Sequence, residues 1–152
     1  DGPEKEKLTQ MAQEMGIADD VVWFGSVAHE DIWALMNLAD VFMITNDVTN
    51  RCNPLYEAAW AACPVISVID PSTADLLKHR TNALLAKKDD TERLGTYLAE
   101  LLCDEGLQQK FTVEQKKMAS GFWTWEKRMH TETSELAKIT NPQIQKRSKC
   151  FQ

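Results

Sequence analysis

Residues 50–58 combine the residue types of a helix start with an acidic side chain one turn further on. Asn53 is a favoured N-cap, because its side-chain oxygen accepts a backbone N–H, and Pro54 fits the first helical position, where no donor is needed. The unpaired N–H groups at such a start, with their partial positive charge, suit a phosphate group. The carboxylate of Glu57 is suited to accept hydrogen bonds from paired hydroxyls, such as those of a ribose.

The same residues also have a purely structural interpretation. An Asn-Pro pair commonly opens a helix, and a glutamate near a helix start is favourable through the helix dipole alone. The choice between binding and simple capping therefore depends on what the neighbouring elements place beside residues 50–58.

The apolar pattern predicts that short strands alternate with helices. Continuous apolar runs indicate strands buried on both faces at residues 21–24, 41–44, 65–69 and 83–86. Apolar residues at helical spacing predict helices over residues 4–15, 29–38, 53–62, 73–78, 91–102, 105–119 and 125–139. This order is typical of an α/β fold with a doubly wound parallel sheet.

The predicted sheet places the candidate site at one edge. In doubly wound sheets the ligand crevice lies at the carboxyl ends of the strands, so the loops after Phe24, Ile44 and Ile69 share that edge. The helix that begins at Asn53 opens at the same edge, which favours the binding interpretation.

Three polar residues, Asp70, Ser72 and Thr73, follow the third predicted strand at this edge. They either line the crevice or, as is commoner for these residue types, cap a helix. The tryptophans Trp23, Trp33 and Trp60 fall within the predicted strand and helices, so we expect them to pack there rather than stack on a sugar.

Length and composition restrict the class of protein. A chain of 152 residues with 43% apolar content can bury one core, so we expect one domain over residues 1–140 and a loose polar tail over residues 141–152. The net charge of -6 argues against a nucleic-acid partner, which favours a basic face. No apolar run approaches the length of about 20 residues that spans a bilayer.

The cysteines and histidines do not indicate a metal site. Cys52, Cys63, Cys103 and Cys150 are far apart in the sequence and form no CxxC pair. Cys63 lies in an apolar segment and is expected to be a buried free thiol, which fits a reducing, cytoplasmic location. The absence of a P-loop and of a GxGxxG motif argues against an ATPase or a dinucleotide oxidoreductase.

Several segments, in their order and spacing, resemble the C-terminal donor-binding domain of GT-B type glycosyltransferases, especially the large retaining family 4. Residues 53–58 and 62–66 are similar to the segment in which a glutamate binds the donor ribose and an Ala-Gly-x-Pro-Val-Ile strand follows. Shorter matches are Asp-Gly-Pro-Glu at residues 1–4, Val-Trp-Phe-Gly-Ser-Val at 22–27 and Leu-Ala-Asp-Val-Phe at 38–42. The likeness covers about residues 1–139.

The resemblance implies a function for each matching residue. Glu57 falls on the second glutamate of the family's Glu-x7-Glu motif, which binds the ribose of a nucleotide-sugar donor. The trio Asn53, Pro54 and Leu55 falls on the helix start whose backbone approaches the donor diphosphate. The complete enzyme would transfer a hexose from the nucleotide sugar to an acceptor, with retention of configuration and without a metal or other cofactor.

The loop after the first predicted strand also has a role in the resembling family. Gly25, Ser26 and Val27 fall on the loop that lies near the nucleobase of the donor. A glycine after a strand is equally typical of a simple turn.

The chain departs from the family pattern at the motif's first glutamate. Thr49 stands at that position, eight residues before Glu57, and provides a hydroxyl instead of a carboxylate. Asn50, Arg51 and Cys52 replace the glycine-rich surroundings. Thr49 and Asn50 stay candidates for contacts with the sugar, but we assign no catalytic residue.

The resemblance also implies that the domain is incomplete at its N-terminus. The family's first strand and the acceptor-binding Rossmann domain would precede residue 1. Because sugar transfer needs both halves to hold the acceptor and exclude water, we expect this chain alone to be inactive. The alternatives are a non-catalytic nucleotide-sugar-binding or interaction module on the same fold and an unrelated phosphate-binding domain of the flavodoxin-like type.

Overall fold

The computed structural model describes residues 2–46, 52–122 and 124–140. Its centre is a small parallel sheet of the strands β1 (Phe42–Ile44), β2 (Val65–Val68) and β3 (Ala83–Ala86), in the order β1-β2-β3. Phe42 pairs with Val65 and Val65 with Ala83, so that β2 is the central strand and is buried along its whole length. The parallel sheet and alternating helices confirm the α/β prediction.

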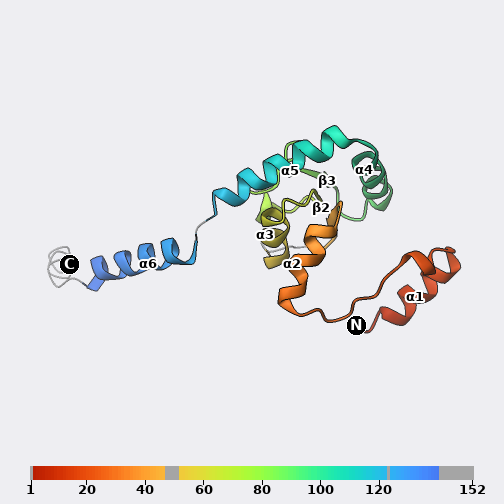
Figure 1. The fold of residues 1–152 in the computed structure, drawn as a ribbon, viewed down its shortest axis with the longest axis horizontal. Coiled ribbons are helices and arrows are strands. Elements are labelled where there is room, and N and C mark those ends of the chain that lie inside the picture. The colour runs from red at the N-terminus through yellow and green to blue at the C-terminus, as the bar shows by residue number, and fades with distance from the viewer. Residues whose placement is uncertain (1, 47–51, 123, 141–152) are drawn as a thin grey trace, which may run out of the picture.

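The helices surround the sheet and extend from it (Figure 1). Their bounds are α1 (Lys5–Glu14), α2 (His29–Leu38), α3 (Asn53–Trp60), α4 (Thr91–Cys103), α5 (Glu105–Ser120) and α6 (Trp125–Thr140). Short 3₁₀ turns lie at Ala18–Asp20 and Pro71–Thr73. The predicted helix over residues 73–78 is wrong, because this segment contains only the end of the second 3₁₀ turn, followed by turns.

Aspartate side chains define two of the helix starts. Asp90 accepts a hydrogen bond from the backbone N–H of Arg93 at 3.0 Å, at the start of α4. Asp104 accepts one from the N–H of Leu107 at 2.9 Å, at the start of α5. Each carboxylate satisfies a backbone donor that has no partner within its helix and lies at the positive end of the helix dipole.

Apolar side chains pack on both faces of the sheet, as a doubly wound fold requires. Val65 and Ala83 belong to one core cluster, which includes Leu55 of α3 and Met36 of α2. Their neighbours on the same strands belong to the other cluster, which includes residues of α4 and α5: Ile66, Leu84, Leu94, Tyr97, Leu101 and Phe111. The alternation along each strand therefore assigns α2 and α3 to one face and α4 to the other.

The predicted strand over residues 21–24 is wrong. This segment lies outside the sheet, where the side chains of Val22 and Phe24 are 69% and 61% exposed. In Figure 1 it belongs to an N-terminal part, with α1, that lies away from the sheet. An apolar run becomes a buried strand only when a neighbouring strand satisfies its backbone groups, and none of the described residues pairs with this segment.

Candidate functional site

The start of α3 lies at the carboxyl edge of the sheet, because α3 connects the parallel neighbours β1 and β2. The N-cap of α3 lies one residue earlier than predicted. Cys52 is the N-cap, without a capping hydrogen bond from its side chain, while Asn53 and Pro54 are the first two helical residues. The predicted N-cap role of Asn53 is therefore wrong; its side chain instead lines a hollow beside the helix.

This hollow, which we call the α2–α3 pocket, has a volume of about 440 Å³. It is lined by the helix residues His29, Trp33, Asn53, Tyr56, Glu57 and Trp60. His29 and Trp33 are one turn apart on α2, and Asn53, Glu57 and Trp60 follow one another at intervals of about one turn on α3. Three aromatic side chains therefore flank one carboxylate.

Glu57 is the polar group that distinguishes the pocket. Its side chain is only 13% exposed, and its Oε1 lies 3.6 Å from Nδ1 of His29. Its Oε2 is buried and has no hydrogen-bond partner among the described residues. Because an unpaired buried carboxylate oxygen carries a desolvation cost, this atom is ready to accept a hydrogen bond from a ligand.

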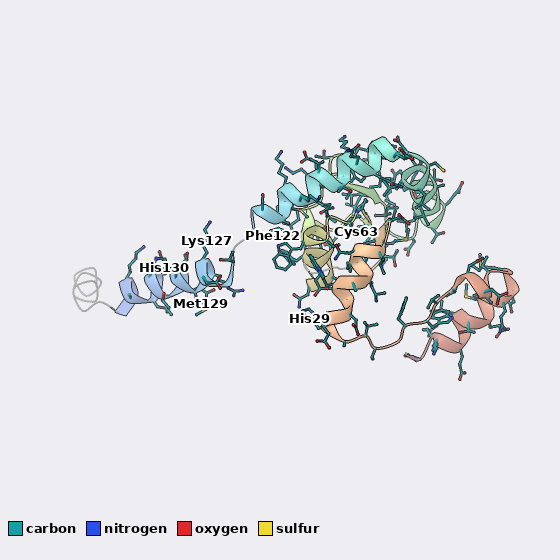
Figure 2. All side chains as sticks on the ribbon, in the orientation of Figure 1. His29, Cys63, Phe122, Lys127, Met129 and His130 are labelled. Carbon is teal, nitrogen blue, oxygen red and sulfur yellow. The ribbon has the colours of Figure 1, made fainter. Side chains whose placement is uncertain are left out.

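Two aromatic residues of the α2–α3 pocket also belong to an aromatic cluster. The ring of Phe122, labelled in Figure 2, meets Tyr56 and Trp60 edge-on at centroid distances of 4.9 Å and 5.9 Å. Trp33 and Trp60 are nevertheless 49% and 54% exposed, so the expectation that they pack within helices is wrong for much of each side chain. Both side chains line the pocket, which is open to solvent, and this explains their exposure.

The predicted phosphate-binding trio is only partly available at the pocket. Leu55 is fully buried in the core, and its backbone N–H donates to the carbonyl of Cys52 at 3.0 Å. Pro54 has no N–H to donate. Asn53 is therefore the member of the trio whose side chain lines the pocket with Glu57.

The predicted nucleobase loop lies beside a different hollow. Gly25 has a φ of 66°, which suits a glycine turn. Ser26 and Val27 line a cavity of about 420 Å³ with Asp31 and Leu35 of α2. The structure therefore does not place Gly25, Ser26 and Val27 in one pocket with Glu57.

Asp70, Ser72 and Thr73 have the capping role. Asp70 accepts hydrogen bonds from the backbone N–H and the hydroxyl of Ser72, both at 2.8 Å. The buried hydroxyl of Thr73 donates to the carbonyl of Asp70 at 3.1 Å. The remaining sugar-site candidates, Thr49 and Asn50, lie outside the described residues.

Cys63 is a buried free thiol, as predicted. Burial and the nearby carboxylate of Asp40 raise its pKa to about 11, so the thiol is protonated at neutral pH. Within residues 2–46, 52–122 and 124–140, no group of three histidine, cysteine or acidic side chains could hold a metal ion. No helix in this described part of the chain is long and apolar enough to cross a membrane.

The residues that the sequence analysis missed are His29, Trp33, Tyr56 and Trp60. A signal for them exists in the i, i+4 spacing of His29 and Trp33 and in the matching face of α3. That spacing alone does not tell which helix faces which, because the packing of α2 against α3 is a tertiary contact.

Curated relatives match the chain over most of its length. A GDP-mannose-dependent alpha-(1-6)-phosphatidylinositol monomannoside mannosyltransferase of Mycobacterium tuberculosis is 27% identical over 132 residues, which is 82% of this chain and 34% of the relative. A lipopolysaccharide core biosynthesis glycosyltransferase of Rhizobium meliloti is 25% identical over 74% of this chain and 32% of its own length. The chain thus spans about a third of the length of these relatives.

Solved structures share the fold. A sucrose-phosphate synthase from Thermosynechococcus elongatus superposes with a TM-score of 0.80 at 18% identity, over 91% of this chain and 36% of that one. The C-terminal domain of a glycosyl transferase group 1 family protein from Francisella tularensis gives a TM-score of 0.70 at 18% identity, over 76% of this chain and 60% of that one. Both likenesses support the GT-B type of fold that the sequence resemblance implied.

A family model settles the classification. The model described as "Glycosyl transferases group 1" matches residues 1–118, which is most of the chain and includes β1, β2, β3 and the whole α2–α3 pocket. The chain therefore belongs to the glycosyl transferases group 1 family.

Proposed function

We propose that this chain forms the nucleotide-sugar-binding part of a retaining glycosyltransferase that transfers a hexose. The observation that carries the proposal is the buried Oε2 of Glu57, which has no partner among the described residues and belongs to a pocket at the carboxyl edge of the sheet. Membership of the family supports the proposal, and so does the printed name of the mycobacterial relative, a GDP-mannose-dependent mannosyltransferase.

The chemistry of the pocket fits a ribose. Two neighbouring hydroxyls can donate to one carboxylate, and a buried carboxylate forms charge-assisted hydrogen bonds that are stronger than neutral ones. The rings of Trp33 and Trp60 offer apolar faces on which a sugar or a base packs. The diphosphate would then lie toward the start of α3, near Asn53, where the helix dipole favours negative charge.

A second candidate function is a non-catalytic nucleotide-sugar-binding or interaction module. It is favoured by Thr49, which stands where the resembling family has its first motif glutamate. This substitution removes a carboxylate from the electrostatics of sugar transfer but leaves the proposed ribose site at Glu57 intact. A transfer assay that finds no sugar transferred by a protein that binds the nucleotide sugar would favour this second function.

Calorimetric titration with UDP, GDP and their sugars tests the proposed binding. Glu57→Gln keeps the size of the side chain but removes its charge, and we expect it to weaken binding by about 1 to 3 kcal/mol. Glu105→Gln, which changes an exposed glutamate on α5, is the matched control and should bind as the unmodified chain does. Absence of binding to a chain that circular dichroism shows to be folded would contradict the proposal.

A further inference from the structure

We propose that His29 is a positioning residue for Glu57, which holds the carboxylate so that Oε2 presents itself to the hydroxyls of the ligand. This inference rests on the proposed function, because it assigns a task to a second side chain of the same pocket. His29 touches the carboxylate, not the reacting atoms, and acts on the ligand through Glu57.

His29 and Glu57 lie close together on neighbouring helices. His29 is the first residue of α2, and Figure 2 labels it at that helix start. Its Nδ1 lies 3.6 Å from Oε1 of Glu57, on the neighbouring helix α3. This distance is too long for a hydrogen bond and corresponds to an electrostatic contact. Because the two oxygens of a carboxylate are rigidly linked, a group that holds Oε1 also sets the direction of Oε2.

The two side chains differ strongly in solvent exposure. The side chain of His29 is 85% exposed, while that of Glu57 is 13% exposed. A side chain as exposed as that of His29 contributes little to core packing. Core packing therefore does not explain why His29 lies beside the nearly buried carboxylate of Glu57. Position at the pocket rim does explain it, because His29 lines the same hollow that the carboxylate faces.

Charge distinguishes these two residues from the rest of the pocket lining. Among the six lining residues, Glu57 is the acidic side chain and His29 is the basic one. The other acidic residues at the start of α2 are Glu30 and Asp31, and Asp31 lines the separate cavity beside Ser26 and Val27. The group of the pocket that lies beside Oε1 of Glu57 is therefore the ring nitrogen Nδ1 of His29, which contacts this oxygen electrostatically.

Side-chain chemistry provides a matched set of variants. Asparagine places its amide nitrogen about where Nδ1 of a histidine lies, whereas glutamine places it farther out, near Nε2. His29→Asn should therefore keep the contact with Oε1, His29→Ala should lose it, and His29→Gln should restore it only in part. The high exposure of His29 makes all three variants compatible with folding.

The experiment compares ribose with a sugar that lacks the hydroxyls. Each protein is titrated with UDP and GDP and with their 2′,3′-dideoxy forms, and the ratio of the two affinities measures hydroxyl recognition. We expect His29→Ala to reduce this ratio about tenfold, through weaker binding of the ribose form alone, and His29→Asn to restore it. A merely structural role of His29 would weaken both ligands equally and leave the ratio unchanged.

The outcomes separate this inference from the proposed function. If the unmodified chain prefers the ribose form and His29→Ala keeps that preference in full, the positioning role is wrong while the ribose site stands. If the unmodified, folded chain binds both forms equally or binds neither, the proposed ribose site itself is wrong and the inference falls with it.

Discussion

The α2–α3 pocket and the buried cluster around Asn82 differ in whether their polar side chains have hydrogen-bond partners. The amide of Asn82 accepts from the backbone N–H of Lys78 at 2.7 Å and donates to the carbonyl of Leu76 at 2.8 Å. The fully buried Gln115 donates in turn to the carbonyl of Asn82 at 2.8 Å. In the pocket, Oε2 of Glu57 has no such partner among the described residues.

A buried polar group that supports the fold has a hydrogen-bond partner within the protein, whereas a group that binds a ligand keeps an atom free for it. Groups that serve the fold are paired with backbone, because an unpaired buried polar atom is costly. Oε1 of Gln115 is also unpaired among the described residues, but it belongs to a fully buried side chain that lines none of the hollows beside Glu57. Among the described residues, Glu57 is the one that combines an unpaired buried oxygen with a place in the lining of the α2–α3 pocket, which supports its proposed role in ligand binding.

The largest expected effect concerns the core beneath the pocket. Leu55, on the core side of α3, is fully buried, so Leu55→Ala should reduce the free energy of unfolding by about 2 to 5 kcal/mol. Leu38→Ala, at an exposed position of α2, is the control and should change it by less than about 0.5 kcal/mol. Urea denaturation measures both, and equal losses would contradict the assignment of α3 to the core.

Asn82→Ala tests the structural side of the comparison. It leaves the N–H of Lys78 and the carbonyl of Leu76 without their partner, at an expected cost of about 2 kcal/mol in unfolding free energy. Asn37→Ala removes an exposed bond to the carbonyl of Trp33 and should cost much less. Nucleotide affinity should be unchanged in both folded variants. A selective loss of affinity in Asn82→Ala would contradict the purely structural role of Asn82.

Cys63 gives a pH-dependent test of another buried group. Its pKa rises from an ordinary value of 9.0 to about 11 in the folded chain. Below pH 9.0 the thiol is protonated in both states, but between these two values only the unfolded state loses the proton. Unfolding free energy should therefore fall by about 1 to 2 kcal/mol across this window, as denaturation in alkaline buffers measures.

The control for that test is a chain without the thiol. Cys63→Ala should show a smaller decrease than the unmodified chain over the same pH range, because the difference between the two isolates Cys63 from other titrating groups. Cys103→Ala, at an exposed position, should not alter the decrease. If the unfolding free energy falls equally with pH in Cys63→Ala and in the unmodified chain, the pKa of the thiol is the same in the folded and unfolded states.

The smallest effect is expected for a charged pair in solvent. Arg80 contacts both oxygens of Glu100, at 2.7 Å and 3.1 Å, on the surface. A double-mutant cycle with Arg80→Met and Glu100→Gln should give a coupling energy below about 1 kcal/mol, because water screens exposed pairs. A coupling energy of several kcal/mol would show that a solvent-exposed carboxylate also contributes strongly to the stability of this molecule.

Much of the fold follows from local sequence pattern. The apolar run at β2 and the aspartates before α4 and α5 lie where the structure has a central strand and two capped helices. The run Val21–Val22–Trp23–Phe24 has the same apolar character as β2 but lies outside the sheet. Local pattern records that a segment is apolar, whereas strand formation depends on a hydrogen-bonding neighbour that pattern does not reveal.

The candidate site likewise contains residues that follow from local sequence pattern and residues that depend on tertiary packing. Glu57 and Asn53 were predictable because helix position and acidity are local properties, and both residues line the pocket. His29 and Trp33 were not, because they reach the site through the packing of α2 against α3. For Leu55 the prediction concerned the backbone at the helix start, and that position did not reveal that its side chain is buried in the core.

The most direct test asks whether Glu57 serves ligand binding or the fold. Glu57→Met replaces the carboxylate with an apolar side chain of similar length, and unfolding is measured with and without added UDP or GDP. We predict that, without ligand, this variant is at least as stable as the unmodified chain, and that only the unmodified chain is stabilised by the nucleotide. A variant that loses stability as Asn82→Ala does, or that the nucleotide stabilises equally, would contradict a binding role for Glu57.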